Sequence, residues 1–170
     1  MKQEKNRILF VCLGNICRSP SAEAVMKKLV HDAGLDDRIT IDSAGTAGYH
    51  RGQMADERMR KHATMRGYNL DSISRPVEPK DYFDFDLIIG MDDSNISELR
   101  RRSPDYESRQ KIHQMTEFSR KKTYDHIPDP YYGGDAGFEL VLDLLEDACE
   151  GLLDYIKEDY LLKEDFKTLT

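Results

Sequence analysis

The sequence lacks the features that mark membrane-spanning, secreted and nucleic-acid-binding proteins. No apolar run approaches the roughly 20 residues of a membrane-spanning helix, and residues 8–13 are too short for the core of a signal peptide. The chain has three cysteines, an odd number that does not form a disulfide framework. Its formal net charge of -7 makes an extended phosphate backbone a poor partner. We therefore expect a cytoplasmic protein that binds neither membranes nor nucleic acid.

Motifs for metals and nucleotides are missing as well. Cys12 and Cys17 are five positions apart without a nearby His or Cys pair, which is poor spacing for zinc. The Gly-x4-Gly-Lys-Ser/Thr loop of nucleotide-binding proteins is absent. We expect no metal and no cofactor. The histidines are dispersed without ligand spacing, and we assign all of them to the surface: His31, His50, His62, His113 and His126.

What is present is an alternation of strand-like and helix-like segments along 170 residues, a length that favours one domain. Apolar runs or alternation predict strands at residues 8–11, 39–41, 86–91 and 111–115. Apolar residues at helical spacing predict helices at residues 21–30, 55–67, 94–102 and 138–156. Asp56 is placed to cap the second of these helices. This order is typical of an α/β fold with a parallel sheet covered on both faces, whose sites lie beyond the carboxyl ends of the strands.

The loop after the first strand, in "FVCLGNICRSPSAEA", has the residues of an anion-binding site. Gly14 permits a tight turn or a close approach to a ligand, and Asn15 tolerates a positive φ angle. Pro20 suits the first position of a helix, with Ser19 as its N-cap. Unpaired amides at that helix start and in the curled loop would form a nest for a phosphate, to which Arg18 adds a planar fork.

The same amides and Arg18 would act on Cys12, which the first strand delivers to this loop. A thiol that faces a helix N-terminus and a guanidinium loses its proton below the usual pKa of about 8.5. The hydroxyl of Ser19 is close enough in sequence to donate to the thiolate. A bare Cys-x5-Arg pattern is short, and by itself it is more often a buried cysteine with an incidental arginine. Its position between a strand and a proline-started helix favours a nucleophile in an anion site.

A second segment, "PDPYYGG", suggests a source for the proton that a leaving oxygen needs during dephosphorylation. Asp129 lies between prolines that stiffen the loop, and the glycines that follow permit a sharp turn. Tyr131 and Tyr132 could line a cleft that takes an aromatic ring. Alone, the segment would be an Asp-Pro turn with surface tyrosines; beside the cysteine loop it indicates a general acid.

Together, "VCLGNICRSPSAEA", "DSAGT" and "PDPYYGG" resemble the low-molecular-weight protein tyrosine phosphatases, in family order and spacing over nearly the whole chain. The resemblance implies a single three-layer domain with a four-stranded parallel sheet, helices on both faces and a phosphate-binding loop after the first strand. It also implies metal-free hydrolysis in two steps. Cys12 would attack phosphorus, Arg18 would clamp the equatorial oxygens, and Asp129 would protonate the tyrosyl oxygen and then activate water.

The resemblance assigns further roles. Ser19 would stabilise the thiolate, and Asn15 with Ser43 would hold the loop in shape. Contacts to phosphate and substrate would come from the loop and from three tyrosines: Leu13, Gly14, Asn15, Ile16, Cys17, Ser19, Tyr49, Tyr131 and Tyr132. The implied partners are phosphotyrosine-containing proteins, with a bacterial tyrosine kinase and a host protein both open, and the protein would be a monomer or a weak dimer.

Two features depart from the family pattern, and the role of a third residue, Cys17, is open. Many relatives carry a His in the loop-supporting network where this chain has Ile73, which implies a rearranged support. The phosphatase domain is expected to span residues 1–158, with residues 159–170 as an extension of the last helix or a tail. Under oxidation Cys17 could form a reversible disulfide with Cys12, as in relatives that have it, or it could be only a small buried residue.

Other functions of the same fold are less consistent with these residues. Arsenate reductases of one class share the fold and loop but need further cysteines, and residues 80–95 contain none. Arginine-phosphate phosphatases carry a Thr in place of Ile16 and a single aromatic residue in place of Tyr131-Tyr132. Both differences favour phosphotyrosine. A phosphate-recognition module without activity would keep the whole catalytic machinery without using it.

Overall fold

The computed structural model describes residues 6–131 and 133–158, and its strands form one parallel sheet in the order β2-β1-β3-β4. The strands are β1 (Asn6–Cys12), β2 (Ile39–Gly45), β3 (Leu87–Gly90) and β4 (Ile112–Gln114). All four predicted strands are present. β2 extends beyond the predicted residues 39–41, because Ser43, Ala44 and Gly45 continue its pairing with β1.

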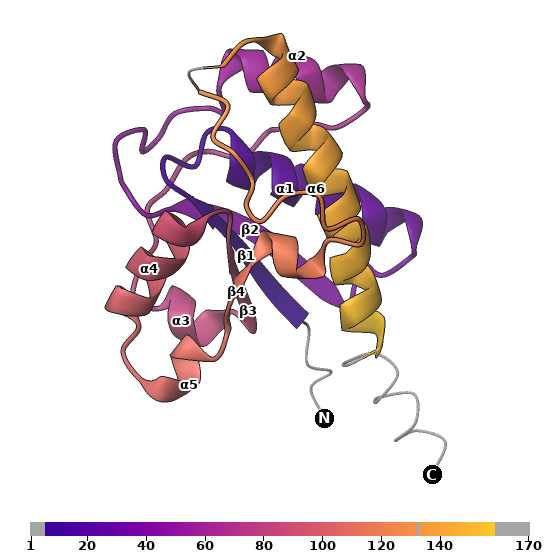
Figure 1. Cartoon of the computed structure of the whole chain (residues 1–170). Helices are drawn as coiled ribbons and strands as arrows, with labels where there is room; N and C mark the ends of the chain where they lie inside the picture. Colours follow the sequence, from indigo (N-terminus) through magenta and orange to yellow (C-terminus); the bar gives the residue numbers. More distant parts are fainter. Residues whose placement is uncertain (1–5, 132, 159–170) are drawn as a thin grey trace.

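Helices cover both faces of the sheet, which confirms the predicted three-layer α/β fold (Figure 1). α1 (Arg18–Asp32) and α6 (Asp135–Ile156) lie on one face, and α4 (Asp93–Arg102) lies on the other. α2 (Glu57–Met65) packs near the start of α6, with Asp56 as its N-cap as predicted. The sequence did not predict three short elements: α3 (Asp81–Asp84), α5 (Tyr106–Arg109) and the 3-10 helix η1 (Met115–Phe118).

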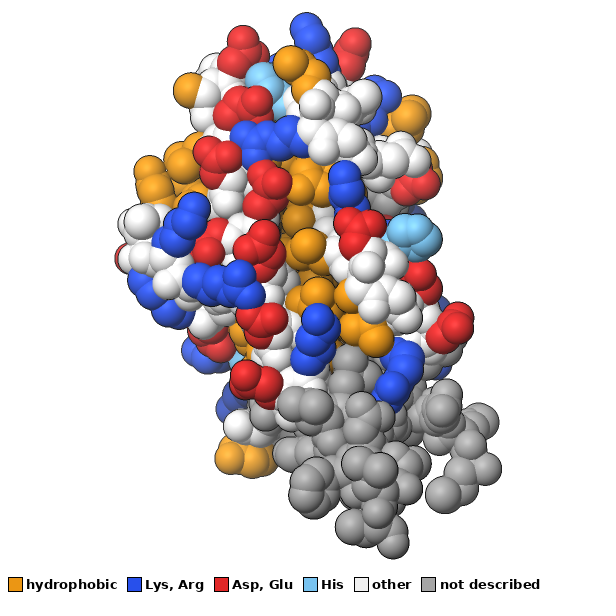
Figure 2. Space-filling model, turned by 90° about the vertical axis from the view of Figure 1, so that its right-hand side faces the viewer, with side chains coloured by type: hydrophobic (Ala, Val, Ile, Leu, Met, Phe, Trp, Pro, Cys, Tyr) orange, Lys and Arg blue, Asp and Glu red, His pale blue; other side chains and the backbone are white. Residues whose placement is uncertain are grey.

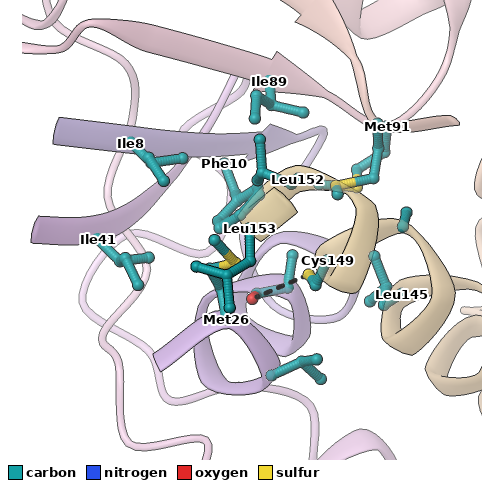
Figure 3. Close-up of a cluster of buried hydrophobic side chains, with 14 of the residues drawn as sticks. Ile8, Phe10, Met26, Ile41, Ile89, Met91, Leu145, Cys149, Leu152 and Leu153 are labelled. Atoms are coloured by element: carbon teal, nitrogen blue, oxygen red, sulfur yellow. Dashed lines mark hydrogen bonds between the residues drawn. The ribbon is translucent and has the colours of Figure 1, made fainter. Parts of the chain in front are cut away.

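The alternation of side chains along β1 divides the core into two layers. Ile8, Phe10 and Cys12 face α1 and α6, whereas Leu9 and Val11 face α4, and all five are buried. Figure 3 shows part of the first layer, where Phe10 lies among side chains of β3, α1 and α6. Burial of each large apolar side chain stabilises the fold by about 1.5–3 kcal/mol. Cys12 thus ends a rigid row of core residues at the carboxyl edge of the sheet.

The long helix α6 joins this core to α2. Its apolar stripe is buried as predicted, including Cys149 in the core and Phe138 in a third cluster with Met59 and Ala63 of α2. Figure 2 looks onto the side of the molecule where α6 lies and shows a band of apolar side chains between charged ones. Within residues 6–131 and 133–158, no helix has the length and apolar character needed to cross a membrane.

Candidate active site

The loop between β1 and α1 turns its carbonyl groups outward. Five of its carbonyl oxygens, those of residues 12–14, 16 and 17, accept hydrogen bonds from groups outside the loop or in α1. The donors are the backbone amides of Thr46, Ala47, Asp56 and Ser21 and the hydroxyl of Ser74. Because the N–H of a trans peptide points away from its C=O, the amides that follow these carbonyls point toward the centre of the loop. Such converging amides form a nest with the charge distribution that an anion requires.

Asn15 holds this loop in its shape. Its φ of 57° is in the left-handed region that asparagine tolerates better than most residues. Its side-chain Nδ2 donates to Ser19 Oγ at 2.7 Å and to Ser43 Oγ at 3.0 Å, and its Oδ1 accepts from the Arg75 amide at 3.0 Å. Gly45 is also required here, because a Cβ would lie 2.8 Å from the carbonyl oxygen of Leu13. The loop is therefore fixed from behind by β2 and by the segment around Arg75.

The sulfur of Cys12 lies where the loop meets α1. It is 3.0 Å from Ser19 Oγ and 3.5 Å from the Ser19 amide nitrogen, and the Cys12 side chain is almost fully buried. The predicted helix start, with Ser19 as N-cap and Pro20 at the first position, is wrong. α1 begins at Arg18 with Cys17 as N-cap, because the Ser19 hydroxyl is engaged by Cys12 and Asn15 and does not cap the helix. Pro20 is still tolerated, since the first-turn amides have no partner within the helix.

Arg18 crosses the loop as a buried cation. Its Nη1 donates to Asp92 Oδ2 at 2.7 Å and to the Ile127 carbonyl at 3.0 Å. Its Nη2 lies 3.6 Å from Asp129 Oδ2. Burial opposes the charge of the guanidinium, but the neighbouring Cys12 sulfur and Asp92 carboxylate outweigh it and raise the pKa of Arg18 above its ordinary value. Arg18 is therefore positively charged and held in one orientation.

Asp129 stands at the rim of the cleft, 41% exposed, and its Oδ1 accepts a hydrogen bond from the Tyr131 amide at 3.0 Å. Arg58 of α2 supports the same segment: its Nη2 donates to the Tyr131 carbonyl at 3.0 Å and its guanidinium stacks on the Tyr131 ring. Asp56 orients Arg58 in turn. Burial alone would raise the pKa of Asp56, but hydrogen bonds from Arg58 and from the Met59 amide hold it below its usual value. The amide of Asp56 donates to Ile16, so α2 links the phosphate loop to the Asp129 segment.

A cleft of about 310 Å³ brings most of the predicted residues together. Its lining consists of Cys12, Leu13, Gly14, Ile16, Cys17, Arg18, Tyr49, His50, Asp129 and Tyr131. Three of the predicted residues do not line the cleft and are buried behind the loop, joined by the hydrogen bonds of the Asn15 amide: Asn15, Ser19 and Ser43. Tyr132 lies outside the described residues. The arrangement places a sulfur at the floor of the cleft, a carboxyl group at its rim and apolar side chains around its walls.

The other two cysteines differ from Cys12 in their surroundings. Burial, together with the nearby Asp56 and Cys12, raises the pKa of the Cys17 thiol far above its usual value. Burial also raises the pKa of Cys149, whose sulfur lies 3.9 Å from the Ala22 carbonyl in the core. Both thiols are therefore protonated at neutral pH, and neither is suited to act as the nucleophile.

Two of the histidines assigned to the surface are placed differently. His50 lines the cleft, where its ring would contact a Cβ at Gly14 and its Nδ1 bonds Gln53 Oε1 at 3.0 Å. His62 is part of α2 and packs against α6: its side chain is only 12% exposed, stacks on Phe138 and has its Nε2 3.1 Å from Asp135 Oδ1. Neither placement could be predicted from the spacing of the histidines in the sequence, because the contacts of His50 and His62 come from packing between distant segments.

Further residues of the site also escaped the sequence analysis. Asp92, which orients Arg18, is the N-cap of α4. Its position directly after a predicted buried strand is the sequence feature that could have identified it. Glu23 accepts a hydrogen bond from Ser43, and nothing in the sequence of α1 distinguishes it as a residue of the site. Ile73 is 52% exposed and pairs with Met54, while its neighbours Ser74 and Arg75 contact the loop. Among the residues that the structure describes, no group of three or more His, Cys, Asp or Glu side chains is placed to hold a metal ion.

Comparison with known proteins agrees with this geometry. A family model described as "Low molecular weight phosphotyrosine protein phosphatase" matches residues 7–162. A putative low molecular weight protein-tyrosine-phosphatase of Synechocystis is 46% identical, with 86% of this chain and 94% of that protein covered. A crystal structure of a protein tyrosine phosphatase from Entamoeba histolytica has a TM-score of 0.88 and 52% identity, covering 91% of this chain and 98% of that one. A drosophila arginine phosphatase is also similar, with a TM-score of 0.83 and 34% identity over 89% of this chain and 98% of that one.

Proposed function

The chain belongs to the low molecular weight phosphotyrosine protein phosphatase family, and on this premise we propose that it hydrolyses phosphotyrosine monoesters through a phosphocysteine intermediate. One observation carries the proposal: the Cys12 sulfur, the loop amides and Arg18 converge on the floor of one cleft whose rim holds Asp129. The loop amides and Arg18 receive the phosphate dianion, and the fixed guanidinium neutralises charge that builds on its oxygens.

The first step transfers the phosphoryl group to sulfur. The Cys12 thiolate attacks phosphorus, so that an S–P bond forms while the P–O bond to the tyrosyl ring breaks. Asp129, 3.6 Å from the Arg18 guanidinium, gives its proton to the departing oxygen. The products of this step are the phenol and a phosphocysteine.

The second step regenerates the enzyme. Asp129, now a carboxylate, accepts a proton from a water molecule as the water oxygen attacks phosphorus. The S–P bond breaks, inorganic phosphate leaves, and Cys12 returns to a thiolate that accepts the Ser19 hydrogen bond. The carboxyl group thus serves as acid and then as base, which suits its partly exposed position at the rim.

The walls of the cleft favour an aromatic leaving group. Leu13, Ile16, Tyr49 and Tyr131 present apolar or aromatic surface against which a tyrosyl ring can pack. We therefore propose that the partners are phosphotyrosine-containing proteins, a tyrosine kinase among them. We also propose that the protein acts in the cytoplasm as a monomer or weak dimer. Tyr132 is retained as a further substrate contact in this proposal.

Replacement of the nucleophile tests the function. We expect Cys12→Ser to reduce turnover of p-nitrophenyl phosphate and of a phosphotyrosine peptide by about four orders of magnitude or more. Because the amide nest and Arg18 are unchanged, the variant should still bind inorganic phosphate in calorimetry. Turnover near the parent rate would exclude the covalent mechanism.

Two controls make this test specific. Cys149→Ala removes a core thiol that does not line the cleft and should keep the parent rate, once its fold is checked by thermal unfolding. Phosphoarginine, assayed in parallel, separates the proposed substrate class from that of the arginine phosphatases. A kcat/KM higher for phosphoarginine than for phosphotyrosine would overturn the choice of substrate.

A further inference from the structure

We propose that Glu23 is a positioning residue that directs a chain of hydrogen bonds toward the Cys12 sulfur, an inference that rests on the proposed function. Glu23 lies in the second turn of α1 and is 5% exposed, although carboxylates are rarely so buried. Its Oε1 accepts from Ser43 Oγ at 2.6 Å and its Oε2 accepts from Lys27 Nζ at 2.5 Å. It does not line the cleft, so any effect on the sulfur passes through other groups.

The first link of the chain has only one possible direction. An ionised carboxylate accepts hydrogen bonds and donates none, so the single hydroxyl proton of Ser43 points to Glu23. Ser43 Oγ must then accept in its other contact, which comes from Asn15 Nδ2 at 3.0 Å. The second hydrogen of the same amide group is directed to Ser19 Oγ at 2.7 Å.

The orientation of the Asn15 amide is set independently from its other side. Its Oδ1 accepts from the backbone amide of Arg75 at 3.0 Å, and a backbone amide can only donate. A flipped Asn15 would place two donors face to face. The NH₂ group therefore faces the two serines, in agreement with the direction that Glu23 imposes from the far end.

The last link reaches the sulfur. Ser19 Oγ accepts a hydrogen bond from Asn15, so its own proton can go to the Cys12 sulfur at 3.0 Å or to the Ala44 carbonyl at 3.4 Å, and a sulfur that is ionised can only accept. With Cys12 as a thiolate, the bonds from Glu23 to the sulfur are therefore compatible with one direction, in which Ser19 donates to the sulfur. Neighbouring hydrogen bonds polarise one another, which strengthens this final bond.

Lys27 makes this arrangement compatible with a negatively charged nucleophile. A lone buried carboxylate would oppose the thiolate by Coulomb repulsion, whereas the adjacent ammonium group compensates its charge. Lys27 is 51% exposed and keeps contact with water. The Glu23–Lys27 pair therefore gives the Ser43 hydroxyl a group that can only accept its hydrogen bond, while the pair as a whole has little net charge.

The test measures the thiol directly and needs no substrate. In Glu23→Gln the Ser43 bond loses its charged acceptor, so the chain is less polarised although Arg75 still orients Asn15. We expect the alkylation rate of Cys12 by iodoacetamide to fall about 2- to 10-fold at pH 6 and its pH profile to move to higher pH, as for the loss of one hydrogen bond. Glu150→Gln, which removes an exposed carboxylate of α6 that pairs with Arg120, should leave the profile unchanged.

A double-mutant cycle with Ser43→Ala separates this role from a structural one. Because Glu23 acts through Ser43, Glu23→Gln should cause no further shift when Ser43 is already Ala. An equal shift in both backgrounds, or a shift to lower pH, would overturn the proposal. If Glu23→Gln does not fold, Ser43→Ala alone must still move the profile to higher pH, and an unmoved profile would refute the chain. The turnover of the parent protein tests the proposed function separately, since alkylation proceeds whether or not phosphotyrosine is hydrolysed.

Discussion

Each group in the cleft is held in place by specific partners, some distant in the sequence and some near. Asp92 and the Ile127 carbonyl orient Arg18, and the Tyr131 amide orients the Asp129 carboxyl group. A nucleophile, a cation and an acid that are fixed before the substrate arrives lose little freedom in the transition state. The rigidity of these side chains is therefore part of how the site would work.

The role of Asp129 can be tested by the leaving group. Asp129→Ala should lower kcat/KM by about 10²- to 10⁴-fold for phenyl phosphate, because the departing oxygen loses its proton donor. The loss should be smaller for p-nitrophenyl phosphate, whose leaving group is more acidic and needs less protonation. The measurement is kcat/KM for a series of aryl phosphates, since this quantity reports the first step and is not affected by hydrolysis of the phosphocysteine.

Asp125→Ala is the matched control, because the Asp125 side chain is 97% exposed and bonds its neighbour His126. It should leave the whole series unchanged. A uniform loss in Asp129→Ala across all leaving groups would remove Asp129 as the acid.

The sequence could identify residues of the site that are grouped in short motifs. Cys12, Arg18 and Asp129 lie in such segments, beside prolines and glycines that shape a loop. Asp92 and His50 carry no comparable pattern. Their contacts follow from how the carboxyl ends of separate strands meet, and one sequence without its fold does not contain that information.

At the scale of elements, long helices and buried strands could be predicted, whereas one-turn helices could not. α3, α5 and η1 each have four residues, too few for a periodic pattern. The end of β2 was missed for another reason: Ser43 and Gly45 are polar or small because they serve the phosphate loop, and so they resemble a turn. Local sequence preference fails where a strand also supports a site.

The contact between α6 and η1 gives a prediction about stability. Gly151 lies in α6 directly beneath the backbone of η1, and a Cβ there would overlap the carbonyl oxygen of Phe118. Alanine is the better helix former by about 1 kcal/mol, yet we expect Gly151→Ala to lower the free energy of unfolding by about 1–3 kcal/mol. Urea unfolding measures the change.

Gly137→Ala, in the same helix, is the control. Its Cβ would meet Pro130 at 3.8 Å, an ordinary contact, so the substitution should be neutral or stabilising. A Gly151→Ala variant as stable as Gly137→Ala would show that η1 does not pack against α6 as described.

At the scale of the whole molecule, the net charge and the site have opposite character. The chain has a formal charge of -7, but its cleft is built to receive a dianion. Backbone amides contribute no net charge, and a single buried Arg18 supplies the cation, so whole-chain composition says little about the ligand of one site. The overall negative charge argues against nucleic acid as a partner. It does not argue against a single phosphorylated side chain, which would contact only the cleft.

The boundary of the phosphatase domain leads to a last prediction. Among residues 6–131 and 133–158, Ile156 is the last buried side chain, and it belongs to the same apolar cluster as Cys12. A protein that ends after residue 158 should therefore keep the Tm of the full chain to within about 2 °C and its kcat/KM for p-nitrophenyl phosphate to within about twofold. A second truncation, after residue 150, removes the buried Leu152, Leu153 and Ile156, each of which stabilises the fold by about 1.5–3 kcal/mol, and it should not fold stably. If the first truncation lost as much stability as the second, residues 159–170 would belong to the domain and the proposed boundary would have to move to the end of the chain.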